Sequence, residues 1–321
     1  MTNRNTLTRT LIALILIVAV VWGGFTFWLQ SLHKSGPLGQ ETTVIFTPGV
    51  STSEIARVLE AQNVIADAFI FKLAARATLS DRIFKAGEYT FEPGISVRGV
   101  MKKLAGGDVL QRQITIPEGL TYQEIRTLLL ASEGLKGPPL EFSEGALLPE
   151  TYDYRWGTKR TELMRRMADA MTETVNQAWQ DRAENLPVAS PQELLILASI
   201  IEKETSIESE RREIAGVFVN RLRRGMKLQS DPTVIYGATD ITDRIRTKHL
   251  REDQPYNTYV HKGLPPTPIA SPGRASVIAA ANPAETDALF FVVDGKGGHV
   301  FSETYAEHKR HVAAMLERNK N

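Results

Sequence analysis

The chain of 321 residues contains no cysteine. This absence excludes disulfide bonds, thiolate catalysis and cysteine-ligated zinc, and it is compatible with an oxidising compartment. The chain also lacks an excess of charge of either sign, because 38 Lys and Arg balance 37 Asp and Glu to a net charge of +1. A strongly basic balance would favour a nucleic-acid partner and a strongly acidic one disorder, so the composition indicates neither.

Long hydrophobic runs are absent after the first 32 residues. From Thr10 to Leu32 no side chain is charged, and a helix of that length spans the roughly 30 Å hydrocarbon core of a membrane. A short basic tail precedes it, and such tails normally stay in the cytoplasm. The alternative is a cleaved signal peptide, but the run is longer than a typical signal core and lacks an A-x-A site. We therefore expect a cytoplasmic tail over 1–9, a single transmembrane anchor over 10–32, a linker over 33–42, and the remainder outside.

A strand–glycine–helix pattern occurs three times after the linker. The runs VIFTP, EYTFEP and QITIPE are rich in β-branched and aromatic residues and predict strands. Each is followed by a turn, a Ser or Thr cap and apolar residues at helical spacing. Glu54 and Glu124 predict capping boxes in the first and third helices, while Gly99 takes that position in the second. The three turns are Gly49-Val50-Ser51, Gly94-Ile95-Ser96 and Gly119-Leu120-Thr121.

These small units carry no catalytic constellation, so we interpret them as a structural or substrate-docking module. The region 43–110 resembles a LysM-like module, a class that implies glycan binding. The segment 159–186 then predicts a long amphipathic helix whose methionine-rich stripe packs in a core. A further helix is predicted to begin after Ser190 as N-cap, with Pro191 at the first position and Glu193 at the third.

The second of these helices runs into a glutamate-rich stretch, ASIIEKETSIESER. At about 100° per residue, Glu204 continues the apolar stripe that contains Leu197, Ile200 and Ile201. A carboxyl group at the edge of an apolar stripe has its charged form disfavoured, which suits a general acid near neutral pH. The alternative is an ordinary ion pair with a nearby arginine on a solvated face.

The other charges of this stretch separate by the same angular argument. Lys203 shares a face with Ser199 and Glu210, and we expect that face to be exposed to solvent. Glu208 and Arg211 follow Glu204 at helical spacing and are expected to be its neighbours.

Two downstream segments carry residues that suit sugar recognition. We expect the helical region to end at Gly225 and the chain to turn at Asp231-Pro232, while QPYNTYVHKGLPPTPIASPG forms a long, proline-rich loop. Aromatic rings stack on pyranose faces, and amides bond to hydroxyl and N-acetyl groups. For each candidate, a purely structural role in the turn or in packing is the alternative. The candidate glycan contacts are Gln229, Asp231, Tyr256, Asn257 and Tyr259.

Three further patterns could indicate a metal site, a phosphate-binding loop or a nucleic-acid patch, and we interpret each as structural. His299, His308 and His311 lack an accompanying carboxylate cluster, so we expect surface histidines and no metal site or cofactor. The run DGKGGH predicts a hairpin turn rather than a phosphate-binding loop. The arginine-rich segment 211–227 predicts salt bridges or contacts to anionic glycan rather than nucleic-acid binding.

Three blocks in order resemble the endolytic murein transglycosylase (YceG-like) family, and the resemblance covers most of the chain after the anchor. They are ASIIEKET…VFVNRLRRGMKLQSDPTVIYG, PYNTY…GLPPTPIASPG and FVVDGKGGHVFSETYAEH. The resemblance implies an α+β fold with an N-terminal transmembrane helix, a small LysM-like α/β subdomain and a mixed α+β catalytic domain over 111–321. It identifies Glu204, on a lytic-transglycosylase-type helix, as the catalytic residue, with Glu202 a weaker candidate.

The resemblance also implies an activity and a location. It implies an enzyme of the bacterial cytoplasmic (inner) membrane, with its N-terminus inside and its catalytic domain in the periplasm. The enzyme cleaves MurNAc–GlcNAc bonds of peptidoglycan strands, leaves 1,6-anhydro-MurNAc ends and terminates nascent strands. The implied partners are glycan strands, the membrane, peptidoglycan synthases and divisome or elongasome proteins, without nucleic acid. The alternative is a non-catalytic, membrane-anchored glycan-binding scaffold.

Overall fold

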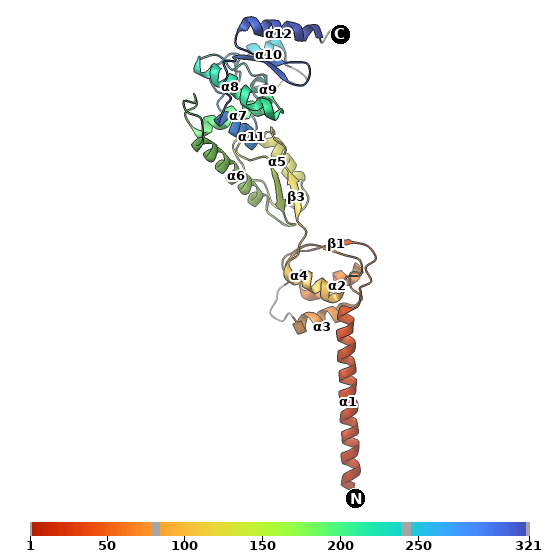
Figure 1. The fold of residues 1–321 in the computed structure, drawn as a ribbon. Coiled ribbons are helices and arrows are strands. Elements are labelled where there is room, and N and C mark those ends of the chain that lie inside the picture. The colour runs from red at the N-terminus through yellow and green to blue at the C-terminus, as the bar shows by residue number, and fades with distance from the viewer. Residues whose placement is uncertain (1, 79–83, 239–244, 319–321) are drawn as a thin grey trace. The chain divides into compact units, whose positions relative to one another are not determined.

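The computed structural model describes residues 2–78, 84–238 and 245–318 (Figure 1). The chain divides into two compact units, one formed by residues 1–112 with 153–157 and the other by 113–152 with 158–321. The fold is mixed α and β, as the sequence predicts. The described strands pair two by two, β1 with β2, β3 with β4 and β5 with β6.

The first unit combines one long helix with a small α/β core. Strands β1 and β2 run antiparallel, with Thr42 opposite Phe91 and Phe46 opposite Gly87. Aromatic side chains from the two strands pack on the helices in one apolar cluster. The elements are α1 (Thr2–His33), β1 (Thr42–Phe46), α2 (Thr52–Ala61), α3 (Ala68–Thr78), β2 (Gly87–Phe91) and α4 (Val97–Gly106).

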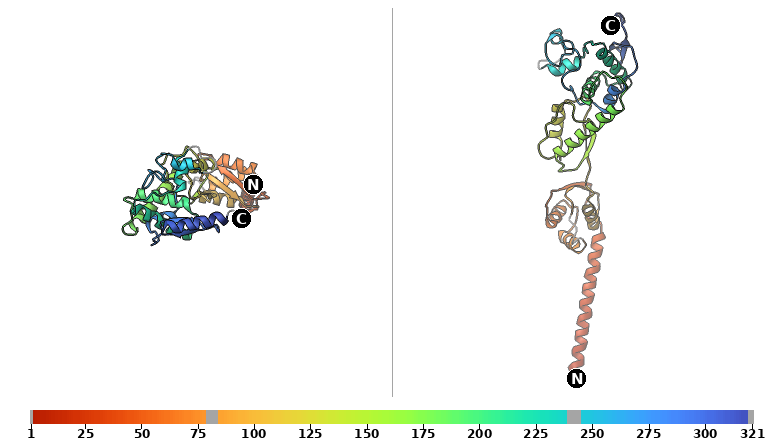
Figure 2. Two further views of the ribbon diagram at one scale, coloured as in Figure 1. Left: turned by 90° about the horizontal axis from the view of Figure 1, so that it is seen from above. Right: turned by 90° about the vertical axis from the view of Figure 1, so that its left-hand side faces the viewer.

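Helix α1 is the apolar helix that the sequence predicts. Among the described residues it is the one helix long and apolar enough to cross a membrane, over Thr8–His33. Figure 2 shows that most of its length lies clear of the rest of the first unit. At its C-terminal end Leu32 is buried in the apolar cluster of that unit. A single apolar helix of this kind fits a single-pass anchor.

The three predicted turn-and-cap units are confirmed. Gly49, Gly94 and Gly119 all have a positive φ, between +70° and +85°, which glycine adopts without a side-chain clash. Ser51, Ser96 and Thr121 each accept the backbone N–H of the third helical residue.

Only one of the two predicted capping boxes is complete. Glu124 closes the box with Thr121 at the start of the third helix. At the start of α2, Ser51 accepts the Glu54 N–H as predicted, but the Glu54 carboxylate pairs with Arg57, one turn along the same exposed helix face. The second half of the predicted capping box is therefore wrong.

The second unit is mainly helical and contains the remaining elements. They are β3 (Arg112–Thr115), α5 (Tyr122–Ala131), β4 (Thr151–Tyr154), α6 (Arg160–Gln180), α7 (Pro191–Glu204), a 3₁₀ turn (Glu208–Glu210), α8 (Arg211–Arg223), α9 (Asp231–Gly237), α10 (Thr247–Arg251), α11 (Arg274–Ala281), β5 (Phe290–Val293), β6 (His299–Ser302) and α12 (Tyr305–Arg318). Strand β3 begins at the boundary residue Arg112, and β4 ends within the segment assigned to the first unit.

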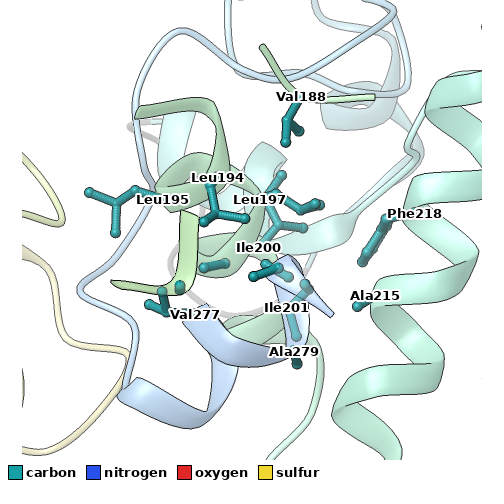
Figure 3. Close-up of a cluster of buried hydrophobic side chains, with 14 of the residues drawn as sticks. Val188, Leu194, Leu195, Leu197, Ile200, Ile201, Ala215, Phe218, Val277 and Ala279 are labelled. Carbon is teal, nitrogen blue, oxygen red and sulfur yellow. The ribbon is translucent and has the colours of Figure 1, made fainter. Parts of the chain in front are cut away.

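Helix α7 forms the centre of the second unit. Every residue from Leu194 to Ile201 is buried, so this helix is enclosed on all sides rather than along one stripe. Figure 3 shows its aliphatic side chains beside Phe218 of α8 and Val277 of α11. Its predicted start is confirmed, since Ser190 accepts the Glu193 N–H at 3.2 Å and Pro191 is the first helical residue.

The predicted core stripe of the long helix α6 is also confirmed, and it packs against this central helix. Its methionines are buried, while Ala168 is half-buried. The buried positions of the stripe are Met164, Met167, Met171 and Val175.

The expected solvent face of the glutamate-rich stretch is only partly correct. Lys203 is exposed, but Ser199 is fully buried, where its hydroxyl donates to the Ile196 carbonyl and accepts the Ile269 N–H. Glu210 is also mostly covered, with 18% of its side chain exposed. The face prediction failed because α7 is enclosed by other elements and ends before Glu210.

Candidate active site

Glu204 is the last residue of α7. The chain becomes extended at Thr205, and Arg211 starts α8, so Glu208 and Arg211 do not follow Glu204 on one helix as expected. Arg211 instead approaches Glu118, at 3.6 Å, and is largely buried there. The position at a helix C-terminus is itself unfavourable for a negative charge, because the helix dipole is negative at this end.

Among the described residues, the carboxyl group of Glu204 has one hydrogen-bonded side-chain partner. Ser230 donates its hydroxyl to Glu204 Oε1 at 2.5 Å. Burial, together with the negative charge of Asp231, raises the pKa of Glu204 to about 7 against the opposing effects of Ser230, His299 and Arg221. A carboxyl group titrating near neutral pH exchanges a proton in either direction, as general acid–base catalysis requires.

Ser230 is held in place by a second loop. Its backbone N–H donates to Thr258 Oγ1 at 3.0 Å, and Gln229 N–H donates to the Thr258 carbonyl at 3.1 Å. Thr233 completes this link, because its hydroxyl donates to the Ser230 carbonyl and contacts the Thr258 hydroxyl. Gln229 has a φ of +51°, an uncommon value for a residue other than glycine. Residues 229–230 are therefore fixed by hydrogen bonds to residue 258, although 28 positions separate Ser230 from Thr258.

Glu204 opens onto a pocket of about 470 Å³. This volume is in the range of small-molecule sites. Its lining combines charged and polar groups with residues of β5 and α12. The lining residues are Glu204, Arg221, Gln229, Asp231, Tyr259, Phe290, Phe291, Val292, Val293, His299, Tyr305 and His308.

Arg221 supplies a buried positive charge to this pocket. Its guanidinium donates to the Leu289 carbonyl at 2.6 Å and to the Leu228 carbonyl at 2.5 Å, and it lies over the Phe290 ring. Burial lowers the pKa of Arg221, and the nearby Tyr259 and Glu204 oppose this effect. The guanidinium thus offsets part of the negative charge that Glu204 carries when ionised.

Three of the five predicted contact residues line the same pocket as Glu204: Gln229, Asp231 and Tyr259. The Tyr259 hydroxyl donates to Asp231 Oδ1 at 2.7 Å. Burial, followed by the contact with Asp231, raises the pKa of Tyr259 well above its ordinary range. Asp231-Pro232 begins helix α9 rather than forming a simple turn, with the proline in the first helical turn where it is tolerated.

The other two predicted contact residues lie outside the pocket lining and hold their loop together. Asn257 is fully buried and donates to the carbonyls of His249 and Glu252. Tyr256 packs edge-on against Tyr236, and its hydroxyl contacts Thr267 at 2.9 Å. The loop itself lacks helix or strand over 252–273, as predicted.

Sequence reasoning missed Arg221 and His299, which line the pocket, and Ser230, whose hydroxyl donates to Glu204. Ser230 had a signal, since it stands between two predicted contacts in the run QSDP. Arg221 was assigned only to a charged cluster. His299 was expected at the surface, but its side chain is 12% exposed and its Nδ1 lies 2.7 Å from Glu210 Oε2.

The predicted hairpin explains why His299 is covered. Strands β5 and β6 pair antiparallel with Val293 opposite His299, and Asp294 N–H donates to the Gly298 carbonyl across the DGKGGH turn. Helix α8 lies against β5, and the turn before α8 brings Glu210 to His299. Over the part of the chain that the structure describes, no group of three or more His, Asp or Glu side chains is arranged to hold a metal ion.

The second unit thus places a half-buried carboxyl group with a pKa raised to about 7 beside a pocket, an arrangement typical of acid–base enzymes. The chain belongs to the YceG-like family, whose model matches residues 44–314. It is 30% identical to the endolytic murein transglycosylase of Bacillus subtilis, over 91% of this chain and 90% of that protein.

Two further relatives extend this likeness. The endolytic murein transglycosylase of Streptococcus pneumoniae is 28% identical over 97% of this chain, which covers 65% of that protein. A crystal structure of a YceG-like protein from Listeria monocytogenes matches with a TM-score of 0.55 at 30% identity, covering 84% of this chain and 98% of that one.

Proposed function

We propose that this protein is a lytic transglycosylase of murein in which Glu204 transfers the protons. The single observation that carries the proposal is the Glu204 carboxyl group, whose pKa is raised to about 7 and which opens onto a pocket of about 470 Å³. The two relatives named endolytic murein transglycosylase support the substrate class.

The reaction has two proton transfers at one carboxyl group. In the first, protonated Glu204 gives its proton to the glycosidic oxygen between MurNAc and GlcNAc as that bond breaks. The substrate N-acetyl group stabilises the electron-deficient sugar carbon. In the second, the Glu204 carboxylate takes the proton of the MurNAc C6 hydroxyl, whose oxygen closes the 1,6-anhydro ring. The carboxyl group ends the cycle protonated, as it began.

The surroundings of Glu204 support both halves of this cycle. Burial and Asp231 favour the protonated acid at the start, while Ser230, His299 and Arg221 favour the carboxylate formed after proton donation. A pKa near the working pH minimises the free-energy difference between these two forms. We assign Gln229, Asp231 and Tyr259 to substrate contact, because they line the same pocket.

The alternative reaction is hydrolysis of the glycosidic bond, in which Asp231 would be the second carboxylate. Glycosidases that add water use two carboxylates, one as acid and the other as base or nucleophile. Asp231 lies in the pocket with Glu204, but it is exposed and accepts the Tyr259 hydroxyl. Our assignment gives it a binding and electrostatic role only.

We further propose that α1 anchors the protein in the bacterial inner membrane, with the N-terminus inside and the catalytic unit in the periplasm. Its length and apolar composition support an anchor, and the two arginines before the apolar run support this orientation. The region 43–110 is assigned as a LysM-like glycan-docking module. From its likeness to the endolytic murein transglycosylases we also propose that the protein terminates nascent strands beside peptidoglycan synthases, divisome or elongasome proteins.

Analysis of the reaction products tests the proposal. Purified full-length protein in detergent is incubated with murein sacculi, and the released fragments are analysed by mass spectrometry. We expect 1,6-anhydro-MurNAc ends, each lighter by one water than a hydrolytic end. Hydrated reducing ends would contradict the lytic reaction and favour the two-carboxylate alternative. Absence of cleavage by the wild-type protein would favour a glycan-binding scaffold.

A further inference from the structure

Helix α3 exposes apolar side chains on the face that a helix of a water-soluble domain normally keeps polar. Phe69 is 67% exposed and Leu73, one turn later, is 43% exposed. Ala77 continues the same stripe after a further turn. The opposite face is apolar as well, because Phe71 and Ala74 are buried in the core of the first unit. Core packing therefore accounts for only one side of α3.

The other two short helices of this unit lack such a stripe. Helix α2 exposes Arg57 and Glu60, and α4 exposes Arg98 and Lys102. All three helices pack on the same core, so packing on that core does not explain why only the outer face of α3, among these three, is apolar. The difference indicates that the outer face of α3 meets a different environment from those of α2 and α4.

This outer face continues onto the apolar helix α1. Gly24, Phe25 and Trp28 of α1 line a shallow apolar depression together with Leu73 and Ala77 of α3. Figures 1 and 2 show α3 beside the C-terminal end of α1.

The length of α1 indicates where this depression lies relative to the hydrocarbon core of the membrane. The apolar stretch Thr8–His33 has 26 residues, whereas a hydrocarbon core needs about 20. If the core begins at Thr8, Phe25 lies inside it and Trp28 lies at its edge. If the core ends at His33, both lie inside. In the first placement α3 meets α1 at the membrane boundary, and in the second it meets α1 within the outer half of the bilayer.

We propose that α3 lies in the outer interface of the membrane that α1 spans, with Phe69, Leu73 and Ala77 turned toward lipid. The partner is the phospholipid surface itself. Lys72 and Arg76, on the same helix, carry charges that reach phosphate groups while their stems remain at the apolar boundary. The inference rests on the proposed membrane anchor and adds a second contact that fixes the orientation of the first unit on the bilayer.

The absence of cysteine allows a direct test with single labels. Cysteine is introduced separately as Leu73→Cys, Ile45→Cys and Val18→Cys, and each variant is coupled to an environment-sensitive fluorophore. Ile45 is the matched control, an aliphatic residue of the same unit that is 38% exposed but lies on β1. Val18, 58% exposed in the middle of α1, reports on the anchor. The full-length variants are reconstituted into vesicles of phosphatidylethanolamine and phosphatidylglycerol.

We expect a spin-labelled lipid quencher near the headgroup to quench the Leu73 label at least about twofold more than the Ile45 label. Aqueous iodide should quench the Ile45 label and spare the Leu73 label. Quenching of the Val18 label by a quencher in the acyl chains shows that α1 is inserted in the membrane. With α1 inserted, equal responses of the Leu73 and Ile45 labels would overturn the proposal. A Val18 label accessible to iodide would overturn the anchor, and the interfacial helix with it.

Discussion

Glu202 and Glu204 stand two residues apart on the last turn of α7 and face two different regions of the second unit. Glu202 Oε2 accepts the Gly273 N–H at 3.0 Å, beside Glu118 and the Gly119 turn. This region is closely packed, since a Cβ added to Gly273 would lie 1.8 Å from the Glu118 carboxyl group. Glu202 thus joins α7 to the start of α11.

The surroundings of Glu204 are open on one side, unlike the closely packed surroundings of Glu202. Its direct side-chain partner is the hydroxyl of Ser230, and the pocket lies beyond it. The two glutamates of EKET therefore differ through the residues that the following loops bring to each. Glu202 serves packing, whereas Glu204 borders an open pocket.

The largest expected effect is on catalysis. Glu204→Gln removes the transferable proton and should lower glycan cleavage by on the order of 10²- to 10⁴-fold. Glu202→Gln is the matched control, since it changes the same atoms two residues away and should retain most of the activity. Release of soluble fragments from sacculi measures both. An active Glu204→Gln variant, or an inactive but folded Glu202→Gln variant, would reverse our assignment of the two sites.

The second effect is on stability and has a defined sign. The folded-state pKa of Glu204 is about 7 against a reference of 4.5, so the folded protein holds this proton more tightly than the unfolded chain. Stability supplied by the protonated form is therefore present below about pH 4.5 and is lost as the pH rises toward 7. A shift of this size corresponds to about 3 kcal/mol.

Removal of this carboxyl group should cancel that loss. The free energy of unfolding of Glu204→Gln, relative to the wild type, should increase by about 3 kcal/mol from pH 4.5 to pH 8. Urea titrations of the wild type and Glu204→Gln at the two pH values measure the difference. A constant difference across this range would show that Glu204 titrates alike in the folded and unfolded protein.

The third effect tests the hydroxyl that supports the carboxylate. Ser230→Ala removes the donor that lowers the pKa of Glu204, so the alkaline limb of the kcat/KM profile should move to higher pH. Loss of this hydrogen bond should also reduce kcat/KM by about tenfold. Ser206→Ala changes an exposed serine nearby and should leave the profile in place. A lower kcat/KM with an unmoved limb would mean that Ser230 does not act on Glu204.

The smallest effect is expected from the neighbouring acid. Asp231→Asn keeps an acceptor for the Tyr259 hydroxyl but removes a charge that raises the pKa of Glu204, so the alkaline limb should move to lower pH. The direction is opposite to that of Ser230→Ala. Asp253→Asn, an exposed aspartate outside the pocket lining, is the control. Complete loss of cleavage in Asp231→Asn would instead indicate that Asp231 takes part in the chemistry.

The local features of the fold could be predicted because they depend on neighbouring residues. Positive-φ glycines, serine and threonine caps and the methionine-rich stripe of α6 are all encoded within about ten positions of the chain. The start of α7 at Ser190 and the hairpin over DGKGGH are of the same kind.

The assembly of the pocket could not be predicted in this way. Ser230 meets Glu204 across 26 positions, and His299 meets Glu210 across 89. The end of α7 at Glu204 was also missed, because neither Gly nor Pro follows it to mark the stop. Asn257 shows the reverse error: its amide suits a sugar hydroxyl, but in the folded chain two backbone carbonyls accept from it.

The central claim is that the pocket holds the Glu204 carboxyl group protonated close to neutral pH. Infrared difference spectra between the wild type and Glu204→Gln isolate the C=O stretch of this one carboxyl group during a pH titration. We expect a band that disappears with a midpoint of about pH 7. A midpoint near 4.5, the ordinary value for glutamate, would contradict it.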